Sequence, residues 1–150
     1  GGCGGGVSGI LVAAERAQAV RGIDWSCTRS AGAAANAEAA GCPIVSRTGS
    51  AAAPPFPPRS FDVVLCRHVL WALPEPERVL RRWAGLLTPG GRLVLIEGYW
   101  HTGGGLHADE LVKMIPPPMV GIQRDDLSGR PLLWGGAVTD ERFAVIASAG

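Results

Sequence analysis

Residues 61–98 constrain the fold most strongly, because two short apolar runs there flank a helical pattern. Residues 61–66 are too few for a helix and rich in β-branched side chains, which predicts a buried strand. Apolar residues then recur at helical spacing over residues 79–87, with arginines between them. Residues 88–91, Thr-Pro-Gly-Gly, predict a turn, and residues 92–97 a second buried strand. Such a βαβ unit is typical of a parallel sheet that helices cover on both faces.

These residues carry a resemblance to a known family. The run FDVVLCRHVL, followed by a helix and by LLTPGGRLVLIEG, resembles the second half of a class I S-adenosylmethionine-dependent methyltransferase, most of all its small-molecule branch, called type 11. The resemblance implies a Rossmann-like three-layer α/β/α sandwich. Its mostly parallel sheet would end in a hairpin with one antiparallel strand. The alternative is another doubly wound α/β domain with a proline–glycine turn.

The whole chain, residues 1–150, is expected to be one such domain. No methionine precedes the opening glycines, and in the family a central strand comes before that loop. We therefore expect an N-terminally truncated domain whose first strand is missing, so that the strands on either side of it pair directly or leave a cleft. We also expect marginal stability and aggregation. Strands are expected at residues 20–23, 44–45, 61–66, 92–97, 119–123 and 142–147, and helices at 7–18, 30–40, 79–87 and 107–115.

The opening glycine loop matches two cofactor patterns. Gly2, Gly4 and Gly6 fit the GxGxG of the methyltransferase loop. Gly4, Gly6 and Gly9 fit the GxGxxG of dinucleotide enzymes, so a nicotinamide-dependent oxidoreductase fragment stays an alternative. In both patterns glycine lets the backbone approach the ligand, and an acid about 20 residues later accepts the ribose hydroxyls. Asp24 holds that position, although a tight turn with a surface aspartate would give the same sequence. The βαβ unit described above favours S-adenosylmethionine.

The resemblance implies cofactor contacts at the ends of several strands. Where the family often has an aspartate for the adenine amino group, this chain has Ser50, a weaker acceptor than a carboxylate. A non-catalytic relative or a degenerate gene product is a third possibility, because of Ser50 and because residues 27–35 lack an apolar helix face. The cofactor-binding residues that the resemblance implies are Gly2, Gly4, Gly6, Asp24, Trp25, Ser50, Ala51, Cys66 and Arg67.

No catalytic side chain is assigned. His68 follows a strand and is a candidate general base, or else it packs against the following helix, and we favour packing. His101 and His107 are interpreted as loop surface residues, and three histidines without ligand spacing predict no metal site.

The tryptophans are interpreted as core or interface anchors. None of Trp71, Trp83, Trp100 and Trp134 is interleaved with a basic run, so they do not predict a stacking platform for bases.

Composition narrows the class of partner. The 150 residues carry a net charge of +1, which gives no basic field for nucleic acid. No apolar run approaches the roughly 20 residues of a membrane span. Cys3, Cys27, Cys42 and Cys66 show no paired spacing, which predicts neither zinc nor a disulfide framework and favours a reduced, cytoplasmic protein. The expected partner is a small-molecule methyl acceptor. Its identity and the oligomeric state are open.

Overall fold

The structure, a computed structural model, describes residues 20–24, 35, 38–39 and 44–150. The chain divides into two compact units, Gly1–Pro55 and Phe56–Gly150, and each is described by itself. The glycine loop, Trp25 and the helix expected at residues 7–18 lie outside the described residues. Of the helix expected at residues 30–40, residues 35 and 38–39 are described and are helical.

The first unit contains two parallel strands, β1 (Val20–Asp24) and β2 (Ile44–Thr48). Asp24 ends β1, as predicted, and pairs in register with Thr48 at the end of β2. Both strands are longer than expected. Ser50 follows β2 in a turn, in which the N–H of Ala53 donates to the carbonyl of Ser50 at 3.1 Å. The carboxyl ends of β1 and β2 lie at the same edge of this two-stranded sheet. Asp24 is the last residue of β1 at that edge, and Ser50 comes two residues after the end of β2.

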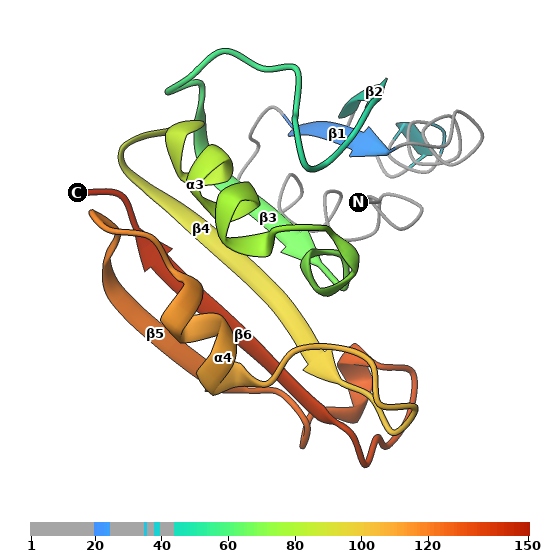
Figure 1. Cartoon of the computed structure of the whole chain (residues 1–150). Coiled ribbons are helices and arrows are strands. Elements are labelled where there is room, and N and C mark those ends of the chain that lie inside the picture. The colour runs from blue at the N-terminus through green and yellow to red at the C-terminus, as the bar shows by residue number, and fades with distance from the viewer. Residues whose placement is uncertain (1–19, 25–34, 36–37, 40–43) are drawn as a thin grey trace. The chain divides into compact units, whose positions relative to one another are not determined.

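The second unit is built on a four-stranded sheet with the order β3-β4-β6-β5 (Figure 1). The predicted parallel pair is confirmed, because β3 and β4 run side by side in the same direction. The predicted antiparallel hairpin is also confirmed, because β6 runs antiparallel to both β4 and β5. The strands are β3 (Phe61–Arg67), β4 (Leu87–Tyr99), β5 (Val120–Asp126) and β6 (Glu141–Ser148).

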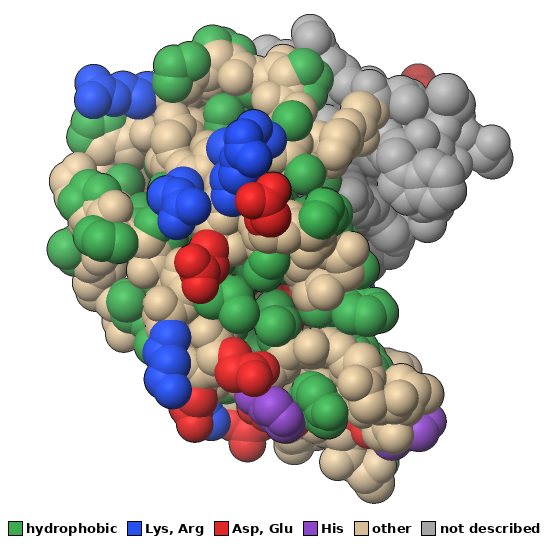
Figure 2. All heavy atoms as spheres, in the orientation of Figure 1, with side chains coloured by type: hydrophobic (Ala, Val, Ile, Leu, Met, Phe, Trp, Pro, Cys, Tyr) green, Lys and Arg blue, Asp and Glu red, His purple; other side chains and the backbone are tan. Residues whose placement is uncertain are grey.

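Two α-helices, α3 (Pro76–Gly85) and α4 (Ala108–Met114), lie on the same face of this sheet (Figure 1). The apolar positions of α3 point inward, since Leu80 is fully buried. Its arginines are exposed, as the predicted solvated face requires, and charged side chains cover that helix in Figure 2. Short 3-10 helices, η2 (Leu70–Ala72) and η3 (Pro131–Leu133), follow β3 and precede β6. The fully buried core includes Leu70, Leu80, Leu93, Leu95, Leu111, Phe143 and Val145.

The Thr-Pro-Gly-Gly segment, residues 88–91, was predicted to be a turn before the strand, but it lies within β4. Strand β4 begins at Leu87, opposite Phe61, and ladder pairing resumes at Arg92, opposite Val63, so the segment bulges out of the strand. Gly90 has φ +74°, and a Cβ on Gly91 would lie 2.8 Å from the carbonyl oxygen of Thr88. Glycine is needed at Gly90 for the backbone angle and at Gly91 for the close approach.

The described strands form two sheets, one in each unit. Direct pairing of the strands on either side of the missing strand, a cleft between them, and the expected marginal stability all stay predictions. Among the described residues, no helix has the length and apolar content that crossing a bilayer requires.

Candidate functional site

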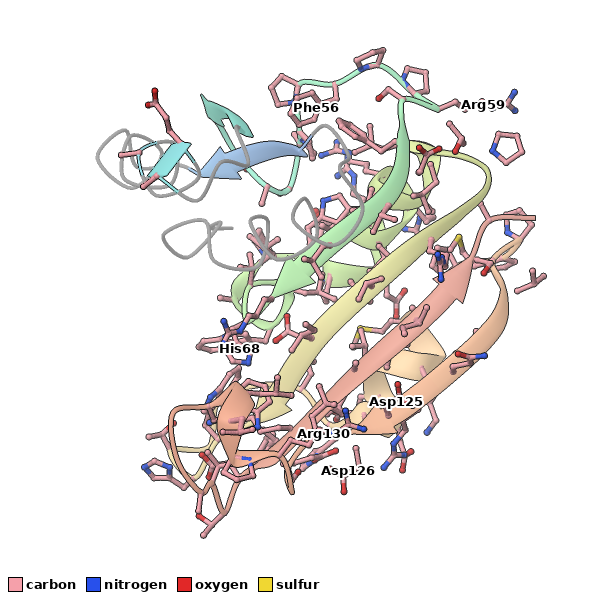
Figure 3. The ribbon with its side chains drawn as sticks, turned by 180° about the vertical axis from the view of Figure 1, so that it is seen from behind. Phe56, Arg59, His68, Asp125, Asp126 and Arg130 are labelled. Atoms are coloured by element: carbon pink, nitrogen blue, oxygen red, sulfur yellow. The ribbon has the colours of Figure 1, made fainter. Side chains whose placement is uncertain are left out.

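The candidate site lies where β3 and β4 end, at the edge of a parallel pair where ligands bind in open α/β sheets. Cys66 is buried there, and Arg67 and His68 are half-buried. The N–H of His68 donates to the carbonyl of Ile96 at 2.9 Å, so the ladder with β4 continues to His68. Figure 3 shows His68 beyond the tip of the β3 arrow, where the chain leaves the sheet.

Glu97 is the fully buried acid of this edge. It continues the inward register of Leu93 and Leu95, and its Oε1 accepts the backbone N–H groups of Val69 at 3.1 Å and Leu70 at 2.8 Å. Its Oε2 is buried and has no hydrogen-bond partner within the described part of the chain. Burial raises the pKa of Glu97 to about 7, although the backbone N–H groups oppose that rise. The carboxyl group therefore holds the loop after β3 and titrates near neutrality.

The Cys66 thiol contacts the same carboxyl group, with Sγ 4.0 Å from Oε1 of Glu97. Burial and the charge of Glu97 raise the pKa of this thiol to about 12. A neutral, buried thiol is a poor nucleophile, so Cys66 fills space and donates weakly to Glu97.

His68 occupies an unusual backbone position, with φ +53°. Its ring stacks on Trp134 at a centroid distance of 5.7 Å and meets the edge of Trp100 at 5.4 Å. His68 packs against other side chains, as expected, but the rings it contacts are indoles that follow β4 and η3, whereas packing against the following helix was predicted. Burial and the charges of Arg67 and Arg142 lower the pKa of His68 to about 4. The ring is therefore neutral at physiological pH.

The other two histidines are surface residues, as predicted. The His101 ring is exposed, with Nδ1 3.3 Å from Oδ2 of Asp140. His107 precedes α4, and its Nδ1 lies 2.7 Å from Oε2 of Glu141. The described residues contain no group of three His, Cys, Asp or Glu side chains that is able to hold a metal ion.

The described members of the predicted cofactor site divide between the two units. Asp24, Ser50 and Ala51 belong to the first unit, and Cys66 and Arg67 to the second. Ala51 is buried, whereas Ser50 is exposed and its hydroxyl oxygen accepts the N–H of Ala52 at 3.2 Å. One cleft shared by all these residues stays a prediction. The remaining members, Gly2, Gly4, Gly6 and Trp25, lie outside the described residues.

Sequence reasoning missed Glu97, which had been treated only as the end of a strand. A signal was present, because an acid in the inward register of an apolar strand needs buried hydrogen-bond donors. Reasoning on the tryptophans was correct for Trp83, which is 4% exposed. No basic run is interleaved with the tryptophans in the sequence, but the fold brings Arg67 and Arg142 to the Trp134 ring from other segments.

Comparison with known proteins supports the resemblance. A model of the methyltransferase domain family matches residues 1–95. Phosphatidylethanolamine N-methyltransferase of Cereibacter sphaeroides is 34% identical over 94 residues, which are 61% of this chain and 46% of that protein. Ubiquinone biosynthesis O-methyltransferase of Photorhabdus laumondii is 33% identical over 94 residues, 61% of this chain and 38% of that protein. The chain thus spans less than half the length of these relatives.

Solved structures share the fold along almost the whole chain. The cyclase SpnF aligns with a TM-score of 0.79 at 22% identity, covering 99% of this chain and 73% of the other. Geranyl diphosphate methyltransferase in complex with its cofactor aligns with a TM-score of 0.81 at 17% identity, covering 99% of this chain and 76% of the other. The predicted Rossmann-like α/β fold is therefore confirmed. The chain belongs to the methyltransferase domain family, in agreement with its resemblance to the class I S-adenosylmethionine-dependent methyltransferases.

Proposed function

We propose that this chain transfers a methyl group from S-adenosylmethionine to a small-molecule acceptor by in-line displacement. The observation that carries the proposal is the family match over residues 1–95, which covers the glycine loop, both strands of the first unit, β3, and β4 as far as Leu95. Because SpnF is a cyclase with the same fold, the fold alone does not establish methyl transfer.

The described residues of the first unit fit the nucleoside part of this cofactor. Asp24 and Ser50 follow the same edge of the β1–β2 pair, as contacts to a ribose and its base require. The Ser50 oxygen accepts the N–H of Ala52, and the Ser50 hydroxyl proton has no acceptor among the described residues, so it is able to donate to a ring nitrogen of adenine. Ser50 in place of the family's aspartate therefore still allows a hydrogen bond to adenine, but with the side chain as the donor.

The cofactor, when bound, supplies a methyl group on a positively charged sulfur, which is a strong methyl donor. The protein then acts mainly by orientation, which supplies roughly 7–11 kcal/mol in well-aligned reactions. Glu97 contributes by fixing Val69 and Leu70, which hold the loop after β3 in place. His68, with its pKa lowered to about 4, is a weak base, so the acceptor's proton leaves to water in this mechanism.

Titration calorimetry with S-adenosylhomocysteine and with NADH tests the proposal. We expect S-adenosylhomocysteine to bind and NADH not to bind. Binding of NADH alone would support the oxidoreductase alternative, and binding of neither would support a relative without cofactor.

Asp24→Ala should weaken S-adenosylhomocysteine binding by about 1.5–3 kcal/mol, because a charged hydrogen bond to the ribose is lost. Asp125→Ala is the matched control, since this exposed acid lies on β5 of the second unit and is no member of the predicted cofactor site (Figure 3). An unchanged dissociation constant for Asp24→Ala would show that Asp24 does not contact the ribose.

The relatives include an N-methyltransferase and an O-methyltransferase, so they leave the acceptor atom open. A cytoplasmic location, expected from the cysteine pattern, belongs to the same proposal. Cell fractionation tests it, and recovery outside the cytoplasm would contradict it.

A further inference from the structure

Beside the ends of β3 and β4, three indole rings and one imidazole ring lie together, and we name His68, Trp71, Trp100 and Trp134 the indole cluster. Trp100 lies at its centre, with centroid distances of 5.1 Å to Trp71 and 5.4 Å to His68. His68 in turn stacks on Trp134 at 19° between the ring planes. His68 and Trp71 come from the segment after β3, Trp100 follows β4 and Trp134 follows η3, so the fold assembles this surface from three segments.

The indole cluster is partly open to solvent. Trp71 is 43% exposed, and Trp100, Trp134 and His68 are half-buried. Trp83, by contrast, is 4% exposed and belongs to the core of the second unit. Several large aromatic rings gathered on an accessible surface mark a place where a ligand or partner binds.

The cluster also carries positive charge. The Arg142 guanidinium lies 5.2 Å from the Trp100 ring centroid and 5.5 Å from that of Trp134, and Arg67 lies 5.6 Å from the latter. Asp140 pairs with Arg142 at 3.3 Å. The Arg67 side chain forms no ion pair or hydrogen bond with the described residues, and His68 is neutral at physiological pH. Within the described part of the chain, one positive charge of the cluster is therefore left without a counter-charge.

This charge decides between two kinds of ligand. Open indole faces bind either an ammonium group or a planar ring. Guanidinium groups already lie over Trp100 and Trp134, and an unpaired Arg67 repels an ammonium group. A planar ring with a negative charge satisfies both features, because it stacks on an indole and pairs with a guanidinium.

We propose that the indole cluster binds the methyl acceptor and selects a planar aromatic compound with an acidic hydroxyl group. The proposal rests on the methyl transfer proposed above and names its acceptor class. The hydroxyl group loses its proton to water, its oxygen bonds to the methyl carbon, and the electron pair of the broken carbon–sulfur bond stays on sulfur. The unpaired arginine favours the ionised hydroxyl group and so replaces a catalytic base.

Binding of three probes to the full chain, followed by tryptophan fluorescence without cofactor, tests the acceptor class. Para-hydroxybenzoate is a planar anion, benzylamine a planar cation and cyclohexanecarboxylate an anion without an aromatic ring. We expect para-hydroxybenzoate to bind at least about tenfold more tightly than either of the others, a difference of about 1.4 kcal/mol. Equal or tighter binding of benzylamine overturns the proposal, and so does failure of all three probes to bind.

Variants locate the site. Trp71→Leu should weaken para-hydroxybenzoate about tenfold and leave cyclohexanecarboxylate unchanged, and Trp71→Phe should restore much of the loss. Arg67→Gln should weaken para-hydroxybenzoate but not benzyl alcohol, which is neutral and has no acidic hydroxyl group. Arg81→Gln is the matched control, since Arg81 is exposed on α3. Unchanged binding in both Trp71→Leu and Arg67→Gln would overturn the assignment to this cluster.

Titration of the same samples with S-adenosylhomocysteine separates the two proposals. If S-adenosylhomocysteine binds and benzylamine is the preferred probe, methyl transfer stands and the acceptor class is wrong. If para-hydroxybenzoate binds at the cluster and S-adenosylhomocysteine does not bind, the aromatic site stands and the proposed function fails.

Discussion

The two ends of strand β4 are built in different ways. At its amino end, the bulge depends on residue types whose backbone preferences are known in advance, Pro89, Gly90 and Gly91. At its carboxyl end, Glu97 is held by backbone N–H groups 27 and 28 residues earlier in the chain, and Trp100 by rings from other loops. The first end is set by local conformation, and the second by side chains that meet only in the folded protein. The residues proposed to bind the methyl acceptor lie beside the second end.

The largest expected effect is that of Gly98→Ala at the carboxyl end. A Cβ there would run into the carbonyl oxygen of Glu141 and the side chain of Arg142 on the neighbouring strand. We expect a loss of about 3 kcal/mol in the free energy of unfolding, the upper range for overpacking, measured by urea denaturation.

Substitutions at two other glycines allow the effect of Gly98→Ala to be compared with that of a substitution at the amino end of β4. Gly91→Ala at the amino end meets Thr88 at 2.8 Å and should cost less, because a bulge adjusts more easily than a paired strand. Gly85→Ala has open space around it and serves as the control. A greater loss from Gly91→Ala than from Gly98→Ala would contradict the difference drawn between the two ends.

Glu97→Gln should have the next largest effect, and it depends on pH. Burial raises the pKa of Glu97 from 4.5 to about 7, so its contribution to stability is complete below its unfolded pKa and is lost as the pH rises through about 7. At roughly 1.4 kcal/mol per pKa unit the loss amounts to about 3 kcal/mol, and relaxation of the site reduces it to about 2 kcal/mol. Glu97→Gln should therefore stabilise the protein at about pH 8 by this amount and change little at about pH 4.

Urea denaturation at both pH values checks this prediction. Glu38→Gln is the matched control, because Glu38 is exposed in the first unit. Destabilisation by Glu97→Gln at about pH 8 would show that Val69 and Leu70 require the full negative charge.

Sequence predicted the sheet of the second unit well because each part of the pattern has a local cause. Alternating short apolar strands and one amphipathic helix sufficed to predict that β3 and β4 run parallel and that α3 buries Leu80. The contacts at the carboxyl edge were not predicted, because Arg67 and Trp134 are far apart in the sequence and no local pattern indicates that the guanidinium will lie over the ring. The cofactor residues came from the family resemblance, and the described residues place Asp24 at a strand end as that resemblance implied.

A smaller pH effect should separate His68 from Glu97. Burial and two arginines lower the pKa of His68 to about 4, so its contribution to stability is present above its unfolded pKa of 6.5 and is lost as the pH falls through about 4. The contribution of Glu97 to the free energy of unfolding changes in the opposite direction over nearly the same pH range. The two pH dependences should therefore largely cancel in the natural protein.

His68→Asn removes the pH dependence of stability that is due to His68. Asparagine tolerates the positive φ of 53° at this position. Its thermal midpoint should fall as the pH rises from about 5 to about 6.5, whereas that of Glu97→Gln should rise over the same range. A flat profile for His68→Asn would mean that the pKa of Glu97 is not raised in solution, and a flat profile for Glu97→Gln that the pKa of His68 is not lowered.

The smallest expected effect is that of Thr88→Val at the amino end. The Thr88 hydroxyl lies 3.0 Å from Oδ1 of Asp62 and 3.3 Å from the carbonyl oxygen of Phe61, and Asp62 is exposed. Water replaces an exposed hydrogen bond easily, so valine should cost only about 0.5–1 kcal/mol in urea denaturation. Thr88→Ser, which keeps the hydroxyl group, is the control. If Thr88→Val costs as much as Gly98→Ala, the bulge depends on this side chain as strongly as the carboxyl end depends on its own contacts, and backbone preferences alone do not build the amino end.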